Sequence, residues 1–226
     1  MSDVVVVTGA AGALGRAVLD ELHRRDLAVA ALDRPGAALD EVGARPGVHP
    51  VAVELADHEA VRQAFQQVDA VGPTAALIAL AGGFRPSSLA QLDQDVLDGM
   101  WQSNVESLLW CCQQAVPRMA AAGGGAIVTM GSKTAVTGPA PLAHATSKAA
   151  VVRASELLAE ELRPQHIRVN CVLPSVIDTP ANRTWMPADL AARAVAPAAV
   201  ARVIAFLIGP DAAPVSGARI PVYGDT

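Results

Sequence analysis

His144 and Lys148 are the two residues whose types and spacing most directly suggest acid–base chemistry. They are four positions apart in a segment predicted to be helical from Leu142 to Leu162, so their side chains lie one above the other. Val151 and Leu158 continue roughly the same face, which therefore points toward the protein. Ionisable side chains on a buried face usually have a structural or functional role, because burying an unpaired charge is costly. The pair is therefore a candidate for proton transfer, with a packed histidine as the alternative.

A glycine-rich run near the start of the chain is the second chemical feature. Four consecutive valines from Val4 predict a strand with no polar face. Gly9, Gly12 and Gly15 follow at intervals of three and precede an amphipathic helix. Glycine lets bare backbone approach a ligand, and the N–H groups at a helix N-terminus attract phosphate. The strand before the run and the helix after it favour a dinucleotide-binding turn over an ordinary one.

Asp33 comes about 20 residues after the glycines, at the end of a second apolar strand. A carboxylate at this position is suited to accept hydrogen bonds from an adenosine ribose, although a turn residue before Arg34-Pro35-Gly36 is the alternative. The same carboxylate would repel a ribose 2′-phosphate, which favours NAD over NADP. Arg34 could partly offset that repulsion.

Strands and helices alternate along the whole chain. Strands are predicted from Val4 onward and at Leu27 to Leu32, Val48 to Leu55, Thr74 to Ala81, Ala126 to Met130, Ile167 to Leu173 and Arg219 to Val222. Helices are predicted after the glycines and at His58 to Val68, Gln94 to Ala120, Leu142 to Leu162 and Ala198 to Leu207. This order predicts an α/β fold of one domain over residues 1–226, a Rossmann-type doubly wound parallel sheet with helices on both faces.

Two further polar residues lie where the predicted elements bring strand ends together. Asn104 falls on the apolar stripe of the predicted helix Gln94 to Ala120, so it either links neighbouring backbone or turns toward a site. Ser132 follows the fifth strand directly. Ala81-Gly82 ends the fourth strand, where glycine permits a close approach or simply a turn.

Composition limits the class of function. The chain has 226 residues, a net charge of −5 and 52% hydrophobic residues, which suits one large core and argues against nucleic acid or an anionic membrane as partner. No run approaches the length of a spanning helix and no signal-peptide pattern begins the chain, so a cytoplasmic protein is expected. Cys111, Cys112 and Cys171 have no metal-ligand or disulfide spacing, so no metal is expected.

The ordered set of motifs resembles the short-chain dehydrogenase/reductase family over nearly the whole chain. The matching stretches are Thr8 to Gly15, Ala81-Gly82, the set Asn104, Ser132 and Lys148, Asn170 with Pro174 to Thr179, and Val222-Tyr223-Gly224. The resemblance implies NAD(H) across the strand ends, a small alcohol or ketone substrate, and a homotetramer or dimer built on the two long helices.

The resemblance also implies roles for individual residues. Gly9, Gly12 and Gly15 would hold the pyrophosphate, Asp33 the adenosine ribose, and Lys148 the nicotinamide ribose. Glu54 would lie near the adenine, and Thr179 near the carboxamide or phosphate. The implied cofactor positions are Gly9, Gly12, Leu14, Gly15, Asp33, Arg34, Glu54, Leu55, Ala81, Gly82, Lys148, Pro174, Ile177 and Thr179.

Three positions depart from the family pattern. Ala79-Leu80 replaces an asparagine pair, Ser175 replaces a glycine, and His144 occupies the position of the catalytic tyrosine, four residues before Lys148. The leading hypothesis is an NAD-dependent oxidoreductase in which His144 is the acid/base, Ser132 orients the substrate oxygen, and Asn104 holds a water linked to Lys148. A neutral imidazole would be a poor acid but a reasonable base near pH 7.

Two other functions stay open. The first is a non-redox enzyme of the same fold, such as an isomerase, dehydratase or cyclase that uses His144. The second is a protein that binds NAD(H) without turnover. A hydrolase based on Ser132 and His144 is the weakest hypothesis, because nothing marks a third triad member. Phe84, Trp185 and Met186 form either an apolar wall of the substrate pocket or ordinary core.

Overall fold

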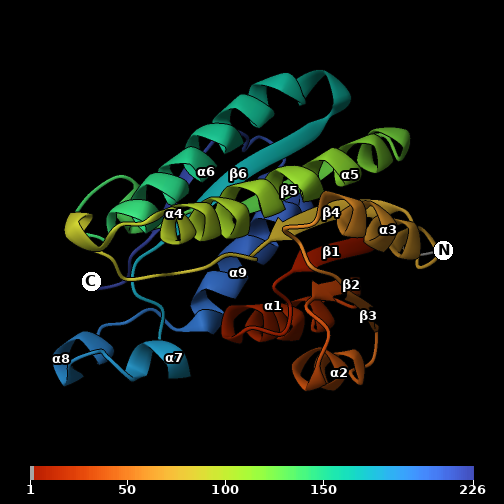
Figure 1. The fold of residues 1–226 in the computed structure, drawn as a ribbon. Helices are drawn as coiled ribbons and strands as arrows, with labels where there is room; N and C mark the ends of the chain where they lie inside the picture. The colour runs from red at the N-terminus through yellow and green to blue at the C-terminus, as the bar shows by residue number, and fades with distance from the viewer. Residues whose placement is uncertain (1–2) are drawn as a thin grey trace.

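The computed structural model describes residues 3–226, in which a parallel sheet is enclosed by helices (Figure 1). Its strands are β1 (Val4–Thr8), β2 (Ala28–Asp33), β3 (Val48–Ala52), β4 (Thr74–Ala79), β5 (Gly125–Met130), β6 (Ile167–Pro174) and β7 (Arg219–Val222). The seven described strands lie in the order β3-β2-β1-β4-β5-β6-β7, and every neighbouring pair is parallel. The order reverses between β1 and β4, the position at which doubly wound sheets bind their ligands.

Helices cover both faces of this sheet. They are α1 (Ala13–His23), α2 (Ala37–Gly43), α3 (His58–Asp69), α4 (Gln94–Trp101), α5 (Ser107–Ala121), α6 (Leu142–Glu161), α7 (Pro180–Arg183), α8 (Ala188–Ala191) and α9 (Pro197–Ile208). A π-helical turn, Gln102–Glu106, joins α4 to α5. Short 3₁₀ turns occur at Leu89–Gln91, Lys133–Ala135, Arg163–Gln165 and Pro210–Ala212.

Two hydrophobic cores lie on opposite faces of the sheet, and β1 supplies both. Val4 and Val6 pack with α3, α5 and α6, whereas Val5 and Val7 pack with α1, α2 and α9. Successive strand residues point to opposite faces, so a strand between two helical layers needs apolar residues at every position. This is why the run of valines forms a central strand.

The structure confirms the fold predicted from sequence. It adds the short helices α7 and α8, ends β3 and β4 two or three residues earlier than predicted, and makes two larger corrections. Helix α2 was not predicted, because its seven residues bury only Leu39 and Val42 and show little periodicity. The predicted continuous helix Gln94 to Ala120 is interrupted by the π turn. Its predicted single apolar stripe is therefore wrong: Leu108, Cys112, Ala115 and Met119 are buried, but Leu97 and Trp101 are 41% and 48% exposed.

No helix among residues 3–226 combines the length and the apolar character needed to cross a membrane.

Candidate functional site

The turn after β1 is packed so tightly that two of its glycines cannot carry a side chain. Gly9 has φ +66°, and a Cβ there would lie 2.9 Å from the Ala81 nitrogen. A Cβ at Gly15 would lie 2.3 Å from the Gly9 oxygen. Gly12, the N-cap of α1, is exposed and would bring a Cβ only to 3.3 Å of that oxygen. Gly9 and Gly15 thus shape the turn, and Gly12 leaves the N-terminus of α1 open.

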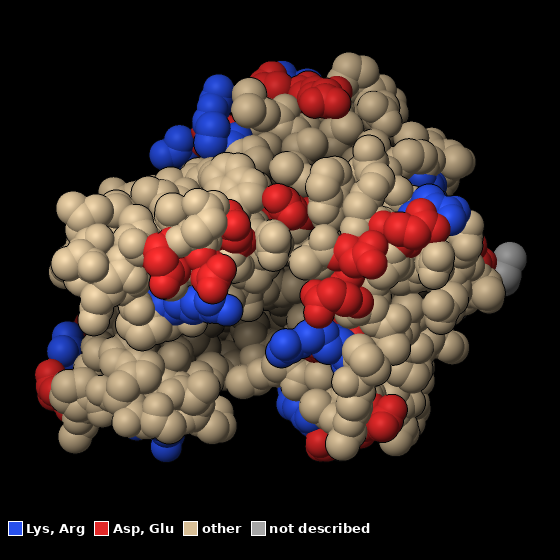
Figure 2. All heavy atoms as spheres, viewed as in Figure 1, with Lys and Arg blue, Asp and Glu red and all other residues tan. Residues whose placement is uncertain are grey.

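A cleft of about 420 Å³ lies against this open helix end. Gly12 and Leu14 form one side, Leu80 another, and Thr179 with Ala181 a third. In the space-filling view the surface is hollowed between α4 and the α1 and α7 segments, and some of the visible charged side chains flank the hollow (Figure 2). A bare helix N-terminus facing a cleft is the geometry that binds a phosphate group, so a dinucleotide fits the residues present.

Asp33 is tied to the glycine turn. Its Oδ2 accepts a hydrogen bond from the Ala11 N–H at 2.8 Å, and its Oδ1 accepts one from the Arg34 N–H at 2.8 Å. The carboxylate thus lies beside the turn, and each of its oxygens retains a lone pair for a further donor. Arg34 itself points outward and is exposed.

The other side chains that sequence assigned to a cofactor are spread along neighbouring strand ends. Glu54 is exposed and its carboxylate accepts only from the Ala56 N–H, at 3.4 Å, whereas Leu55 is 8% exposed. Pro174 ends β6, and half-buried Ile177 forms an isolated bridge with Val195. Thr179 caps α7 by accepting the Asn182 N–H at 3.1 Å.

Asn104 and Lys148 converge on the segment that follows β4. A Cβ at Gly82 would lie 2.6 Å from Asn104 Oδ1 and 3.1 Å from Lys148 Nζ. Asn104 Oδ1 accepts from the Gly83 N–H at 2.9 Å, and Asn104 Nδ2 donates to the Gly83 carbonyl at 3.3 Å and to Ser147 Oγ at 3.0 Å. Asn104 therefore links the backbone after β4 to α6, and glycine at position 82 makes room for the contact.

Lys148 is buried and its ammonium donates to the Met130 carbonyl at 2.9 Å. No acidic partner accepts from Lys148 among the described residues, where its one hydrogen bond is to that neutral carbonyl. Burial lowers the pKa of Lys148 to about 8. The lysine can therefore exchange a proton close to neutral pH.

His144 is also buried, with 9% of its surface exposed. Its ring packs edge-on against Phe84, and its buried Nδ1 has no hydrogen-bond partner among residues 3–226. Burial, and to a smaller extent the charge of Lys148, lowers the pKa of His144 to about 4. The expectation of a base that titrates near pH 7 is therefore wrong for this ring, because its charged form is desolvated.

Ser132 lies at the end of β5, two residues after Met130, whose carbonyl accepts from Lys148. Its Oγ shares a 2.8 Å hydrogen bond with Thr134 Oγ1 and accepts from the Thr134 N–H at 3.2 Å. Ser175 is turned toward the end of β7, where its hydroxyl donates to the Tyr223 carbonyl at 2.7 Å.

The structure adds residues that sequence reasoning missed. Ser147 joins Asn104 to the His144 carbonyl, to which its hydroxyl donates at 2.9 Å, and Thr134 orients Ser132. Small hydroxyl residues are common in helices and loops, so neither gave a signal. Phe84 was predicted as either pocket wall or core, and its 56% exposed surface excludes the core. Trp185 is 54% exposed and is excluded from the core in the same way.

Comparisons with known proteins agree with this geometry. A profile described as short chain dehydrogenase matches residues 3–190. The chain is 32% identical to a probable short-chain type dehydrogenase/reductase of Bradyrhizobium diazoefficiens, over 98% of this chain and 90% of that protein. It is 28% identical to a galactitol 2-dehydrogenase (L-tagatose-forming) of Cereibacter sphaeroides, over 96% and 92%. A solved structure of a mutant Serratia marcescens short-chain dehydrogenase/reductase superposes with a TM-score of 0.91 at 29% identity, covering 99% of this chain and 97% of the other.

Proposed function

This chain belongs to the short-chain dehydrogenase/reductase family, and we propose that it is an NAD-dependent oxidoreductase of a small secondary alcohol or ketone. The observation that carries the proposal is the convergence of Asn104 and Lys148 on Gly82, beside the cleft at the N-terminus of α1. Polar groups buried this closely at the carboxyl ends of parallel strands mark a reaction site.

In this proposal the residues around the cleft hold the dinucleotide. The backbone of Gly9, Gly12 and Gly15 takes the pyrophosphate, and Lys148 takes the nicotinamide ribose. The remaining contacts come from Leu14, Arg34, Glu54, Leu55, Ala81, Gly82, Pro174, Ile177 and Thr179. When bound, the nicotinamide supplies the hydride acceptor or donor. Asp33 accepts the adenosine ribose hydroxyls and repels a 2′-phosphate, which supports NAD over NADP.

His144 replaces the expected tyrosine as the group that handles the substrate oxygen. Because no acceptor lies within reach of the buried Nδ1, we assign the ring proton to Nε2, where it can be donated in a hydrogen bond. In this proposal Thr134 Oγ1 is the donor in the bond between the two hydroxyls, so Ser132 accepts from Thr134 and keeps its own O–H to donate to the substrate. Two neutral donors of this kind stabilise negative charge that develops on the oxygen of a ketone during reduction.

The proton that completes the alcohol then comes from another group. A neutral imidazole is a poor acid, so direct acid/base catalysis by His144 gives way to donation from its Nε2–H. Lys148, with its pKa lowered to about 8, is the buried cation able to release a proton near neutral pH. Asn104 can use the free lone pair of its Oδ1 to hold a water molecule that links Lys148 to the substrate oxygen.

The chain also presents apolar side chains that suit an interface with a second copy of itself. Trp101 of α4, Leu109 of α5 and Leu157 of α6 are 48%, 37% and 52% exposed. Exposed large apolar side chains on neighbouring helices are typical of interfaces. They support a dimer or tetramer.

Binding and turnover measured separately test the function. Titration of the protein with NADH, followed by fluorescence, should show saturable binding. A panel of secondary alcohols and ketones with NAD(H) should then give turnover. If the protein binds NADH but turns over none of the panel, it is a binding protein or a non-redox enzyme. These two functions together are the second candidate, because His144 replaces the phenol of the family.

A further inference from the structure

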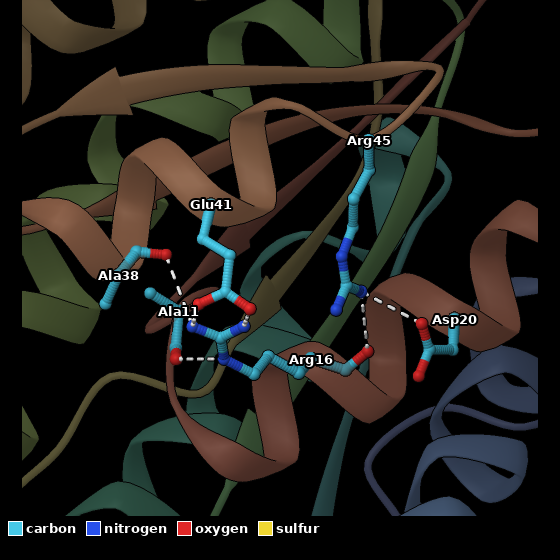
Figure 3. Close-up of polar contacts among 6 residues, drawn as sticks. All are labelled: Ala11, Arg16, Asp20, Ala38, Glu41 and Arg45. Carbon is cyan, nitrogen blue, oxygen red and sulfur yellow. Dashed lines mark hydrogen bonds and ion pairs between the residues drawn. The ribbon is translucent and has the colours of Figure 1, made fainter.

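Arg16 of α1 is held at the adenosine end of the proposed nucleotide site by three partners. Its guanidinium pairs with both carboxylate oxygens of Glu41 in α2, at 2.7 and 2.9 Å (Figure 3). Its Nε donates to the Ala11 carbonyl at 3.0 Å, and its Nη2 donates to the Ala38 carbonyl at 3.4 Å. Arg16 therefore joins the glycine turn to α2.

Ala11 connects the Arg16 guanidinium to the Asp33 carboxylate. The N–H of Ala11 donates to Asp33, and the carbonyl of the same residue accepts from Arg16. The two atoms belong to one residue, so the Arg16 guanidinium and the Asp33 carboxylate lie at opposite ends of a single residue of the turn. Two hydrogen bonds, of 2.8 and 3.0 Å, and this one residue therefore connect the Arg16 guanidinium to the carboxylate that is proposed to hold the ribose.

Glu41 neutralises the charge of the Arg16 guanidinium. The bidentate pair raises the pKa of Arg16 and lowers the pKa of Glu41, so both groups stay charged and paired. We propose that Glu41 is a specificity-determining residue: its pairing withholds the Arg16 guanidinium from a ribose 2′-phosphate and adds to the repulsion by Asp33. This inference rests on the proposed binding of NAD(H).

Arg16 should remain in place when Glu41 is neutralised. Its hydrogen bonds to the carbonyls of Ala11 and Ala38 do not involve Glu41, and its side chain is only 26% exposed. The substitution Glu41→Gln keeps the size of the side chain and removes one negative charge. It therefore leaves an unpaired guanidinium beside the ribose site.

A neighbouring ion pair provides a matched control. Arg45 donates to Asp20 of α1 at 2.9 Å and to the Arg16 carbonyl at 3.4 Å, and these residues lie next to the Arg16 pair in Figure 3. Asp20 is 59% exposed and Glu41 is 67% exposed. Asp20→Asn therefore removes the same charge from a similar surface pair. Asp20 also acts on Arg16 through its charge, but the hydrogen-bonded Arg16–Glu41 pair stays intact in this variant.

The experiment compares NADPH and NADH affinities by fluorescence titration for the wild type, Glu41→Gln, Asp20→Asn and the double variant Arg16→Met/Glu41→Gln. We expect Glu41→Gln to raise the affinity for NADPH relative to NADH by roughly two- to five-fold, the size of an exposed ion pair. The gain should shrink at high salt, be clearly smaller in Asp20→Asn, and disappear in the double variant. Thermal unfolding checks that each variant is folded.

The outcomes separate the two proposals. An unchanged ratio in Glu41→Gln, or an equal gain in Asp20→Asn, would overturn the role of Glu41 while leaving NAD(H) binding in place. A gain that persists without Arg16 would also overturn it. If the folded wild type binds neither nucleotide, the proposed function fails, and the role of Glu41 fails with it.

Discussion

The imidazole of His144 packs against the ring of Phe84, with ring centroids 5.0 Å apart and ring planes inclined by 69°. This contact covers part of the ring, and His144 as a whole is buried, so the charged imidazolium would lack water. The neutral ring is therefore the form that meets the substrate in our proposal.

Variants of His144 separate its packing from its chemistry. His144→Phe keeps an aromatic ring against Phe84 but removes the Nε2–H, so kcat should fall by roughly 10²-fold with little change in unfolding temperature. His144→Tyr should raise turnover above the wild type, because the nearby ammonium favours a phenolate, and general acid–base help contributes about 10²–10⁴-fold. Steady-state kinetics with NAD(H) measures both. A loss of activity in His144→Tyr would show that the imidazole has chemistry of its own.

The pH dependence of reduction should report Lys148. The pKa of the lysine is lowered to about 8, so its protonated form is present below that value and is lost as the pH rises through it. Reduction, which consumes a proton, should therefore decline above about pH 8. Profiles of kcat/KM across roughly pH 5.5 to 9.5 should show this inflection in both the wild type and His144→Phe. An inflection near pH 6.5 that disappears in His144→Phe would mean that the ring titrates as an exposed histidine does.

Two glycines of the turn should respond to alanine in opposite ways. Gly15→Ala should lower stability by about 1–3 kcal/mol or more, because its Cβ would overlap the Gly9 and Ala10 oxygens of a fixed backbone. A Cβ at Gly12 would make one tight contact, 3.3 Å from the Gly9 oxygen, instead of the overlap at Gly15. Gly12→Ala should therefore unfold closer to the wild-type temperature but bind NADH more weakly, because its methyl group lies at the N-terminus of the helix. Urea unfolding and NADH titration check the pair. Equal stability losses would mean that Gly12 is also structural.

Asp33→Ala should change nucleotide preference. The variant loses the charge that repels a 2′-phosphate and the acceptor proposed for the ribose, so NADH affinity should fall by roughly ten-fold or more while NADPH affinity changes less. Arg34→Ala is the matched control and should weaken NADPH more than NADH. Calorimetry or fluorescence measures all four affinities. A wild type that prefers NADPH would make Arg34 the specificity residue instead.

The oligomeric state should depend on the exposed face of α5 and α6. We expect the wild type to scatter light as a species larger than the 23.1 kDa chain, and Leu157→Asp to shift it toward the monomer. Phe206→Asp on α9, which covers the opposite face of the sheet, should leave the mass unchanged. Dissociation by Phe206→Asp alone would move the interface to α9.

The sequence predicted the elements whose patterns are strong. Mostly apolar runs predicted every described strand, and the spacing of Gly9, Gly12 and Gly15 predicted the turn because steric rules act over a few residues. The Arg16–Glu41 pair was missed because the partners are 25 positions apart and ordinary surface residues by type. A neutral His144 was expected from the nearby Lys148, but the larger cause of its lowered pKa, burial, was not. Burial is a property of packing, and Phe84 lies 60 positions from the histidine.

The π turn Gln102–Glu106 sets the helical phase of α5. A π turn holds one residue more than an α turn, so α5 is rotated by about 100° relative to an uninterrupted continuation of α4. An uninterrupted α-helix of the same sequence would bring Leu97 and Trp101 into line with Leu108, which would restore a regular amphipathic stripe. The same rotation would carry Asn104 away from Gly83, so the more regular helix would disconnect the amide from the backbone beside Lys148.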